Sequence, residues 1–297
     1  MRLDDSATTS SSVAVPNGAV LAFLGVAAFS FTLPATALAL EGFGPWTTAV
    51  LRASVAGLIA AGCLAAVRAP LPTRAQLPAL AAVAAGCVVG FPLLSSLALG
   101  STGAGDAAVV VGLLPVTTAV LATVRGGVRH SPAFWAAAGV GAAAVAGFTL
   151  VRTGGAPGLG DLFLFGALLT CAYGYAEGGR LSVALPGWRV IAWGLVLALP
   201  LTLPATALAL ALEPAEPTPS ALAGTAYLAL VSQFGGFVPW YSGMGLIGVA
   251  RAGQIQLAQP LLTLVWAALL LGERIDPFAL PAALVVLGCI AVTQRVR

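Results

Sequence analysis

Long apolar runs, separated by short charged connections, constrain this chain more than any other feature. A bilayer core about 30 Å thick needs roughly 20 apolar residues per helix, and charged or helix-breaking residues divide the sequence into ten runs of about that length. The runs span residues 18–40, 45–67, 76–99, 104–124, 132–151, 159–180, 188–212, 219–242, 250–271 and 277–294. They predict an all-α integral membrane protein with ten transmembrane helices.

Composition excludes several kinds of soluble protein and enzyme. Only 8% of the 297 residues are charged, against about 25% in soluble domains, so most of the surface must face lipid. All 13 basic residues are arginine, and without lysine the chain can form neither a Walker A loop nor a Schiff base. A single histidine and four separated cysteines predict no metal site and no cofactor. A net charge of +3 with scattered arginines predicts no nucleic-acid partner.

Charges outside the runs predict the orientation of the chain. Residues 1–17 are polar and acidic, unlike a cleaved signal peptide, and we expect a disordered cytoplasmic tail before an uncleaved first helix. With the N-terminus inside, the arginines in cytoplasmic segments are Arg2, Arg68, Arg74, Arg125, Arg129, Arg180, Arg189, Arg251, Arg295 and Arg297. Only Arg152 and Arg274 fall in outside loops. The positive-inside rule therefore predicts a multi-pass membrane protein with both termini in the cytoplasm.

The second half of the chain repeats the first at an offset of 145 residues. Residues 105–132 align with residues 250–277 without gaps, so that proline meets proline at Pro115 and Pro260. Threonine, glycine and arginine positions also coincide along the two segments. Matches between such special residues indicate a duplication more strongly than matches between alanines and leucines.

This offset divides the chain into two repeats of five helices, residues 18–152 and 153–297. The nonapeptide TLPATALAL also occurs twice, at 32–40 and 202–210, but its spacing does not fit the offset, and we attribute it to chance. Because five is an odd number, the second repeat enters the membrane with inverted topology. Inverted repeats are typical of secondary transporters, whose substrate sites lie near the membrane midplane.

The repeated segments carry a resemblance to a known family. "ALGSTGAGDAAVVVGLLPVTTAVLA" (98–122) and "GMGLIGVARAGQIQLAQPLLTLVWAALLLGERIDP" (243–277) resemble the paired signature of the drug/metabolite transporter superfamily, EamA type. In "LRASVAGLIA" (51–60), Arg52 matches that family's second-helix arginine. Glu273 matches its glutamate after the ninth helix, although the first repeat has no glutamate at the equivalent position.

The resemblance implies a ten-helix secondary transporter, not an enzyme, that exports small metabolites by alternating access around a central cavity. Within the superfamily the chain is most similar to bacterial aromatic amino-acid exporters. This implies substrates with aromatic or other apolar side chains and a location in the bacterial inner (plasma) membrane. The alternative is a proton-coupled multidrug antiporter that uses Glu177. A membrane-embedded enzyme, a third alternative, lacks the acid pairs, lysines and histidine clusters that catalysis needs. Besides the substrate, the expected partner is the lipid bilayer, and the expected assembly is a monomer.

Polar and aromatic side chains within the runs are the candidate substrate-binding residues. In the ninth run Gln256, Gln259 and Thr263 share one helical face, and hydrogen bonding between helices is the alternative role for the two amides. The eighth run adds Gln233, Phe237, Trp240 and Tyr241 on one face. Trp240 and Tyr241 suit a substrate pocket and an interfacial belt equally well. In the sixth run Tyr173 is a further candidate, with Tyr175 to one side, and the weaker candidates are Ser30, Thr32, Ser95 and Ser96.

Two charged side chains lie well inside the runs. Arg52 is a candidate to bind a substrate carboxylate, and the alternative is that its long side chain extends toward the outer surface or toward Glu41. Glu177 is a candidate proton site near the cytoplasmic end of its run. Arg180 follows one helical turn later, which favours a structural ion pair instead.

Glycine and proline predict where the helices bend and pack. The expected hinges are Pro115, Pro260, Gly235 and Gly236, because proline removes a backbone hydrogen bond and glycine adds conformational freedom. In "GVGAAAVAG" (139–147), Gly139, Ala143 and Gly147 share one face. A face of such small residues predicts close packing against a neighbouring helix.

Overall fold

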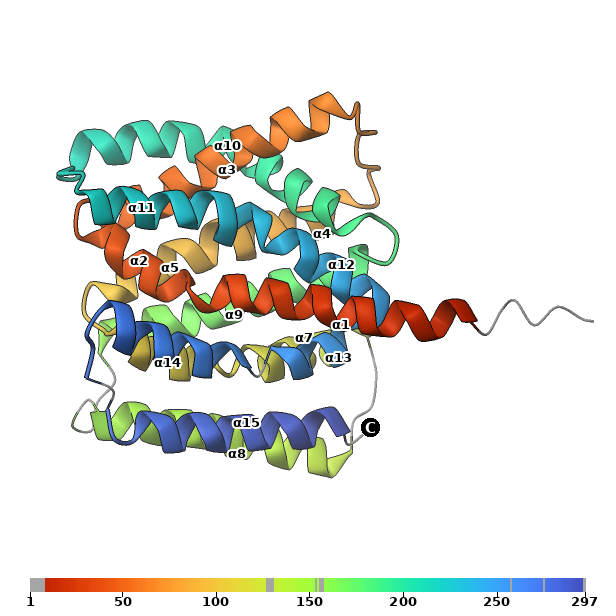
Figure 1. Ribbon diagram of the computed structural model, residues 1–297, viewed down its shortest axis with the longest axis vertical. Helices are drawn as coiled ribbons and strands as arrows, with labels where there is room; N and C mark the ends of the chain where they lie inside the picture. The colour runs from red at the N-terminus through yellow and green to blue at the C-terminus, as the bar shows by residue number, and fades with distance from the viewer. Residues whose placement is uncertain are drawn as a thin grey trace, which may run out of the picture.

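The computed structural model describes residues 9–126, 131–152, 154, 158–256, 258–274 and 276–295, which fold almost entirely into helices (Figure 1). The helices are, in chain order, α1 (Thr9–Ser30), α2 (Thr32–Leu40), α3 (Pro45–Ala66), α4 (Leu77–Val83), η1 (Ala84–Gly90), α5 (Phe91–Leu99), α6 (Ala104–Val111), α7 (Leu114–Gly126), α8 (Pro132–Arg152), α9 (Leu159–Leu181), α10 (Gly187–Leu212), α11 (Pro219–Tyr227), η2 (Leu228–Gly235), α12 (Phe237–Ile247), α13 (Val249–Ile255), α14 (Ala258–Leu270) and α15 (Ala279–Arg295). Segments η1 and η2 are π-helical. The described residues form no strand, only one isolated bridge between Phe43 and Ala215. The all-α prediction is confirmed.

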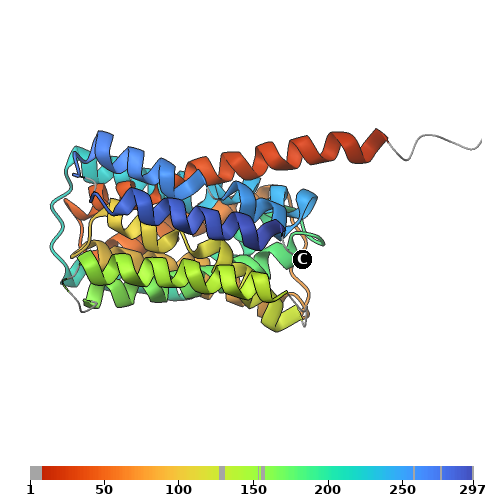
Figure 2. The same cartoon turned by 90° about the horizontal axis from the view of Figure 1, so that it is seen from below.

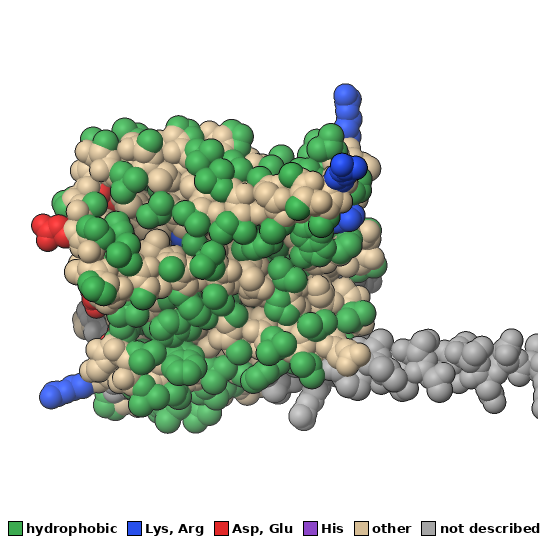
Figure 3. Space-filling model, turned by 45° about the horizontal axis from the view of Figure 1, so that its top comes forward, with side chains coloured by type: hydrophobic (Ala, Val, Ile, Leu, Met, Phe, Trp, Pro, Cys, Tyr) green, Lys and Arg blue, Asp and Glu red, His purple; other side chains and the backbone are tan. Residues whose placement is uncertain are grey.

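Eight apolar stretches of the described chain are long enough to cross a membrane. They are Asn17–Leu40, Pro45–Ala66, Leu77–Leu99, Ala104–Leu121, Leu159–Leu181, Gly187–Leu212, Pro219–Ile247 and Arg251–Leu270. Two shorter apolar stretches, Trp135–Val151 and Ala279–Cys289, coincide with the fifth and tenth expected runs. Apolar side chains cover the flank of the bundle (Figure 3), as expected for a surface in lipid. The total of ten crossings stays a prediction.

Both ends of the described chain lie at the same end of the bundle (Figure 1). Helix α1 begins at Thr9, inside the segment 1–17 for which a tail is expected, and projects beyond the other helices (Figure 2). Residues 1–8 lie outside the described residues, as do three arginines of the orientation argument, Arg2, Arg129 and Arg297. The tail and the cytoplasmic location of the termini stay predictions.

Proline determines where several spans break. Segments α2, α5, α7, α12 and α14 carry a proline within their first three residues, namely Pro34, Pro92, Pro115, Pro239 and Pro260. Proline fits the first turn of a helix, but it leaves the carbonyl four residues earlier without its usual donor. Two of these carbonyls, those of Ser30 and Val88, accept hydrogen bonds from side chains of the other half of the chain. The four expected hinge residues lie at such breaks: Pro115 and Pro260 are in the first turns of α7 and α14, Gly235 ends η2, and Gly236 separates η2 from α12.

The irregular segments recur at the expected offset of 145 residues. Segment η1 covers residues 84–90, and η2 covers residues 228–235, where the offset gives 229–235. The break after α6 likewise corresponds to the break after α13. The packing repeats too. Helices α1 and α2 pack against α12 and α11, and their counterpart α9 packs against α5 and α4, the segments that the offset pairs with α12 and α11. These recurrences support the duplication, and the inverted insertion of two five-helix repeats stays a prediction.

Acidic side chains gather at one end of the bundle, and most of the arginines visible in Figure 3 lie at the other end. At the end where α2 stops and α3 begins lie Glu41, Asp106, Asp161, Glu213, Glu216, Glu273 and Asp276. Three of these carboxylates accept backbone N–H groups at helix N-termini: Asp161 at α9, Glu213 at α3 and Glu273 at α6. The helix dipole and N–H groups without partners favour a carboxylate there. Glu273 therefore ties the α14–α15 connection to the start of α6.

Close helix packing occurs at other glycines than the sequence predicts. A Cβ atom at Gly139 or Gly147 meets no described atom within 4 Å, so the prediction for that face of α8 is wrong. At Gly86 a Cβ would clash with the Thr170 carbonyl oxygen, and at Gly174 with the Cys87 sulfur. Segment η1 therefore packs directly on the backbone of α9, where a small residue is required.

Candidate functional site

A cavity lies between the two halves of the chain, and we call it the central cavity. The first half lines it with Phe29, Thr32, Leu33, Arg52, Cys87, Phe91 and Leu114. The second half contributes Cys171, Tyr175, Ser232, Gln233, Phe237 and Gln259. The π-helical segments carry three of these side chains, because Cys87 belongs to η1 while Ser232 and Gln233 belong to η2. Irregular backbone thus surrounds the cavity, where π-helical segments often mark functional sites.

Arg52 is the charged group of the central cavity. Its side chain is 2% exposed, so it neither extends toward the outer surface nor meets Glu41 there. Nη2 donates to the Ser232 hydroxyl at 2.9 Å, and Ser232 Oγ lies 2.8 Å from Thr32 Oγ1. Nε and Nη1 have no hydrogen-bond partner. The structure therefore points the arginine into the central cavity and not toward the surface, and its role in binding a substrate stays a prediction.

Gln233 joins the two π-helical segments. Its Nε2 lies 3.2 Å from the Cys87 carbonyl oxygen and 3.3 Å from that of Val88. The Val88 carbonyl is available because Pro92, four residues later, has no N–H to donate. Gln233 is fully buried, and its Oε1 has no partner. The amide is thus anchored through its nitrogen, and its oxygen remains an acceptor beside the central cavity.

Five aromatic rings form one cluster next to these polar groups. The cluster consists of Phe29, Tyr175, Phe237, Trp240 and Tyr241. Phe29 and Phe237 meet edge to face with ring centroids 4.7 Å apart, and Tyr175 lies 6.0 Å from Phe237. Trp240 and Tyr241 are 1% and 0% exposed, so they lie inside the bundle rather than in an interfacial belt. The rings of Phe29, Tyr175 and Phe237 line the cavity, where they offer flat apolar surfaces.

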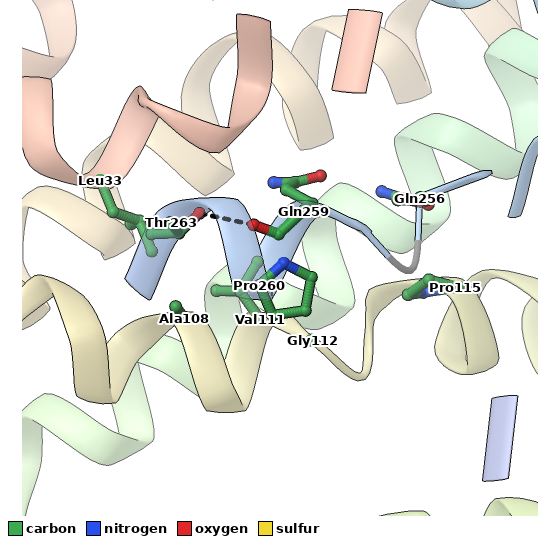
Figure 4. Close-up of a pocket in the computed structure, with 9 residues that line it drawn as sticks. All are labelled: Leu33, Ala108, Val111, Gly112, Pro115, Gln256, Gln259, Pro260 and Thr263. Atoms are coloured by element: carbon green, nitrogen blue, oxygen red, sulfur yellow. Dashed lines mark hydrogen bonds between the residues drawn. The ribbon is translucent and has the colours of Figure 1, made fainter. Parts of the chain in front are cut away.

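A second pocket adjoins the central cavity at Leu33 and Gln259 (Figure 4). Gln256, Gln259, Pro260 and Thr263 line it together with α6, so the predicted face of the ninth run does point into a pocket. Thr263 Oγ1 lies 2.7 Å from the Ser30 carbonyl oxygen, which Pro34 leaves without a helical donor. Gln256 Nε2 and Gln259 Oε1 are buried without partners.

The comparisons with known proteins agree with this architecture. The EamA-like transporter family matches the chain twice, over residues 16–150 and 158–294. This chain belongs to the EamA-like transporter family. It is 41% identical over 279 residues to the uncharacterized transporter YdeK of Bacillus subtilis (strain 168). The aligned region covers 94% of this chain and 97% of that protein.

Two further similarities are more distant. The EamA-like transporter is 29% identical over 284 residues to the probable terminal-alkyne amino-acid exporter of Streptantibioticus cattleyicolor, with 92% of each chain covered. It also matches a crystal structure with a TM-score of 0.65 and 19% identity, over 95% of this chain and 96% of that chain. The family and the first relative identify a multi-pass membrane transporter rather than an enzyme, and the resemblance read from the sequence is confirmed.

Several candidate residues of this EamA-like transporter lie outside the two pockets. In α9, Tyr175 lines the central cavity and Tyr173 does not. Ser95 is buried and donates to the Pro92 carbonyl at 3.2 Å. Ser30 is engaged as well, because its hydroxyl donates to Ala27 and accepts from a tryptophan of α14. Both serine hydroxyls therefore form hydrogen bonds within their own helix, and that of Ser30 also joins α1 to α14.

Glu177 forms an ion pair. Its Oε2 lies 2.6 Å from Arg180 Nη2, one turn later in α9. The side chain of Glu177 is 6% exposed and lines neither pocket, whereas that of Arg180 is 70% exposed. For Glu177 the geometry therefore favours a structural ion pair over a proton site.

Phe29, Cys87 and Cys171 were not expected at the site. In a span that is apolar on every side, no hydrophobic periodicity separates the cavity face from the lipid face. The described residues contain no group of three or more His, Cys, Asp or Glu side chains arranged to hold a metal ion. The central cavity has room for about one water molecule in this conformation.

Proposed function

We propose that this EamA-like transporter exports amino acids with aromatic or other apolar side chains across the bacterial inner membrane. The observation that carries the proposal is the central cavity, which places polar groups without partners beside four aromatic rings. Such a site matches a small molecule with a polar head and a flat apolar side chain. The relative from Streptantibioticus cattleyicolor, a probable terminal-alkyne amino-acid exporter, supports amino acids as the substrates.

Alternating access between residues 18–152 and 153–297 is the proposed mechanism. Both halves line the cavity, and the breaks at Pro115, Pro260 and Gly235–Gly236 are the proposed hinges. Rocking about these breaks opens the cavity to one side of the membrane at a time. Gln256, Gln259 and Thr263 line the pocket next to the cavity, and we assign them to the path or the rim of the substrate site.

Transport by facilitated diffusion fits the described site, because no carboxylate lines the central cavity. A proton-coupled multidrug antiporter is the second candidate, favoured by the burial of Glu177 and opposed by its ion pair with Arg180. A Glu177→Gln variant separates the two. An antiporter that uses this carboxylate loses its response to a pH gradient, whereas a facilitative exporter keeps full transport.

Counterflow in proteoliposomes tests the proposed function. Vesicles are preloaded with unlabelled phenylalanine, tryptophan or threonine, and uptake of labelled phenylalanine is followed with and without a pH gradient. The proposal predicts faster uptake with the two aromatic amino acids inside, independent of the gradient. Uptake that no preloaded amino acid stimulates contradicts it and directs the search to cationic drugs.

A further inference from the structure

Arg52 is a buried cation without an anion. Its guanidinium donates one hydrogen bond, to Ser232, and no carboxylate of the described residues forms an ion pair with it. Arginine remains charged in proteins. A buried charge without a partner destabilises the folded state strongly, so it requires a compensating group. The compensating anion must come from a molecule that enters the cavity.

The contacts of Arg52 leave the right donors free for a carboxylate. Nη2 carries two N–H groups and uses one for Ser232, while Nε and Nη1 have no partner. Free N–H groups therefore remain on all three nitrogens. Two neighbouring N–H groups of a guanidinium match the two oxygens of a carboxylate, which gives a short, charge-assisted pair of hydrogen bonds. Thr32 and Ser232 hold each other at 2.8 Å and thereby position the guanidinium.

Gln233 supplies an acceptor in the same cavity. Both contacts of its Nε2 are to carbonyl oxygens, which can only accept hydrogen bonds, so the NH2 end of the amide must face them and the orientation of the amide is fixed. Its Oε1 is consequently the buried atom without a partner. An amide oxygen is a suitable acceptor for an ammonium group, which carries three N–H donors. The cavity thus holds a free cationic donor and a free neutral acceptor.

We propose that Arg52 binds the α-carboxylate of the transported molecule, and that Gln233 Oε1 accepts from its amino group. This inference deepens the proposed function, on which it rests for the identity of the substrate. The carboxylate is the required feature, because it alone neutralises the buried charge. Amines without a carboxylate, including cationic drugs, are poor ligands of this cavity, since they bring a second positive charge to Arg52.

A ligand series on the unaltered protein tests the proposal without relying on a variant that can fail to fold. Phenylalanine, phenylalaninamide and 3-phenylpropanoate compete with labelled phenylalanine for counterflow, and each is tested for thermal stabilisation of the purified transporter. Phenylalaninamide keeps the ring and the ammonium group but lacks the carboxylate. Loss of charge-assisted hydrogen bonds predicts binding about 10- to 100-fold weaker than that of phenylalanine. The propanoate, which lacks only the ammonium group, falls between the two.

Variants then assign the effect to Arg52. Arg52→Gln is expected to lower the affinity for phenylalanine about 10- to 100-fold while the affinity for phenylalaninamide stays the same or rises. Arg74→Gln is the control, because Arg74 is exposed in the connection between α3 and α4. This variant should bind the three ligands with the same order of affinities as the wild type. Equal binding of phenylalanine and its amide by the unaltered transporter would overturn the proposal even if amino acids are transported.

The two proposals fail in different ways. Stabilisation by 3-phenylpropanoate that disappears in Arg52→Gln, without counterflow of any amino acid, refutes the proposed substrates and upholds the carboxylate site. Amino-acid counterflow that Arg52→Gln leaves intact upholds the proposed function and refutes the role of Arg52.

Discussion

Supplying Arg52 with an internal anion is the most informative perturbation of this transporter. Ser232 Oγ lies 2.9 Å from Arg52 Nη2, so a Ser232→Asp substitution places a carboxylate against the guanidinium. The Asp side chain supplies, from the position of the Ser232 hydroxyl, the negative charge that we assign to the substrate carboxylate. The account therefore predicts that one substitution makes the protein more stable and removes its transport activity.

The expected magnitude follows from the unpaired state of Arg52. Breaking a buried ion pair costs about 3–5 kcal/mol because one charge is left without a partner. Pairing Arg52 recovers part of that amount, less the cost of desolvating the new carboxylate, for a net gain of about 2 kcal/mol. In a protein of this size each kcal/mol shifts the unfolding temperature by roughly 2–4 °C, which gives an increase of about 4–8 °C.

Thermal unfolding in detergent and counterflow in proteoliposomes measure the two effects on the same preparation. Ser232→Asn is the matched control, since it has nearly the same shape as Asp and no charge, and it is expected to be no more stable than wild type. Phenylalanine should stabilise the wild type and leave Ser232→Asp unchanged. A destabilised Ser232→Asp protein, or one that exchanges phenylalanine at the wild-type rate, refutes the reasoning about an unpaired Arg52.

Three further predictions follow from the packing and the cavity. Gly86→Ala forces a Cβ against a rigid carbonyl of α9 and should destabilise by about 1–3 kcal/mol, whereas Gly62→Ala, with no neighbour within 4 Å, should be neutral; thermal unfolding compares them. Glu273→Gln keeps one oxygen but loses the charge that holds two N–H groups at the start of α6. It should lower the free energy of unfolding by about 1–2 kcal/mol in the same assay. In a variant that retains only Cys171, alkylation by N-ethylmaleimide should be slow, because this cysteine is buried in the cavity lining, and phenylalanine should slow it further; labelling that phenylalanine does not affect would place the substrate elsewhere.

The spans and their breaks could be predicted because they depend on local properties of the chain. Apolar length places the helices to within a few residues, and the prolines at Pro115 and Pro260 mark breaks that the structure contains. The offset of 145 residues is also visible in sequence, and the π-helical segments later follow it. The π-helical geometry itself leaves no local signal, since it depends on the packing of η1 against α9.

The site could be predicted only in part, because the direction of a side chain in an apolar helix depends on its neighbours. Gln233 and Phe237 are rare or large enough in their span to be noticed, and both line the cavity. Tyr173 and Tyr175 are two residues apart in an apolar helix, and the sequence cannot decide which of them faces inward. Arg52 posed the same difficulty, since an inward and an outward rotamer are equally compatible with its position in α3.

Counterflow of labelled phenylalanine tests the central claim most directly, with equal pH on both sides and wild type, Arg52→Gln and Arg74→Gln reconstituted in parallel. The account predicts transient accumulation of label in vesicles that contain wild type or Arg74→Gln and are preloaded with phenylalanine, and none with Arg52→Gln. Absence of accumulation with the wild type, or accumulation with Arg52→Gln equal to that of the wild type, would contradict an amino-acid exporter whose substrate carboxylate binds Arg52.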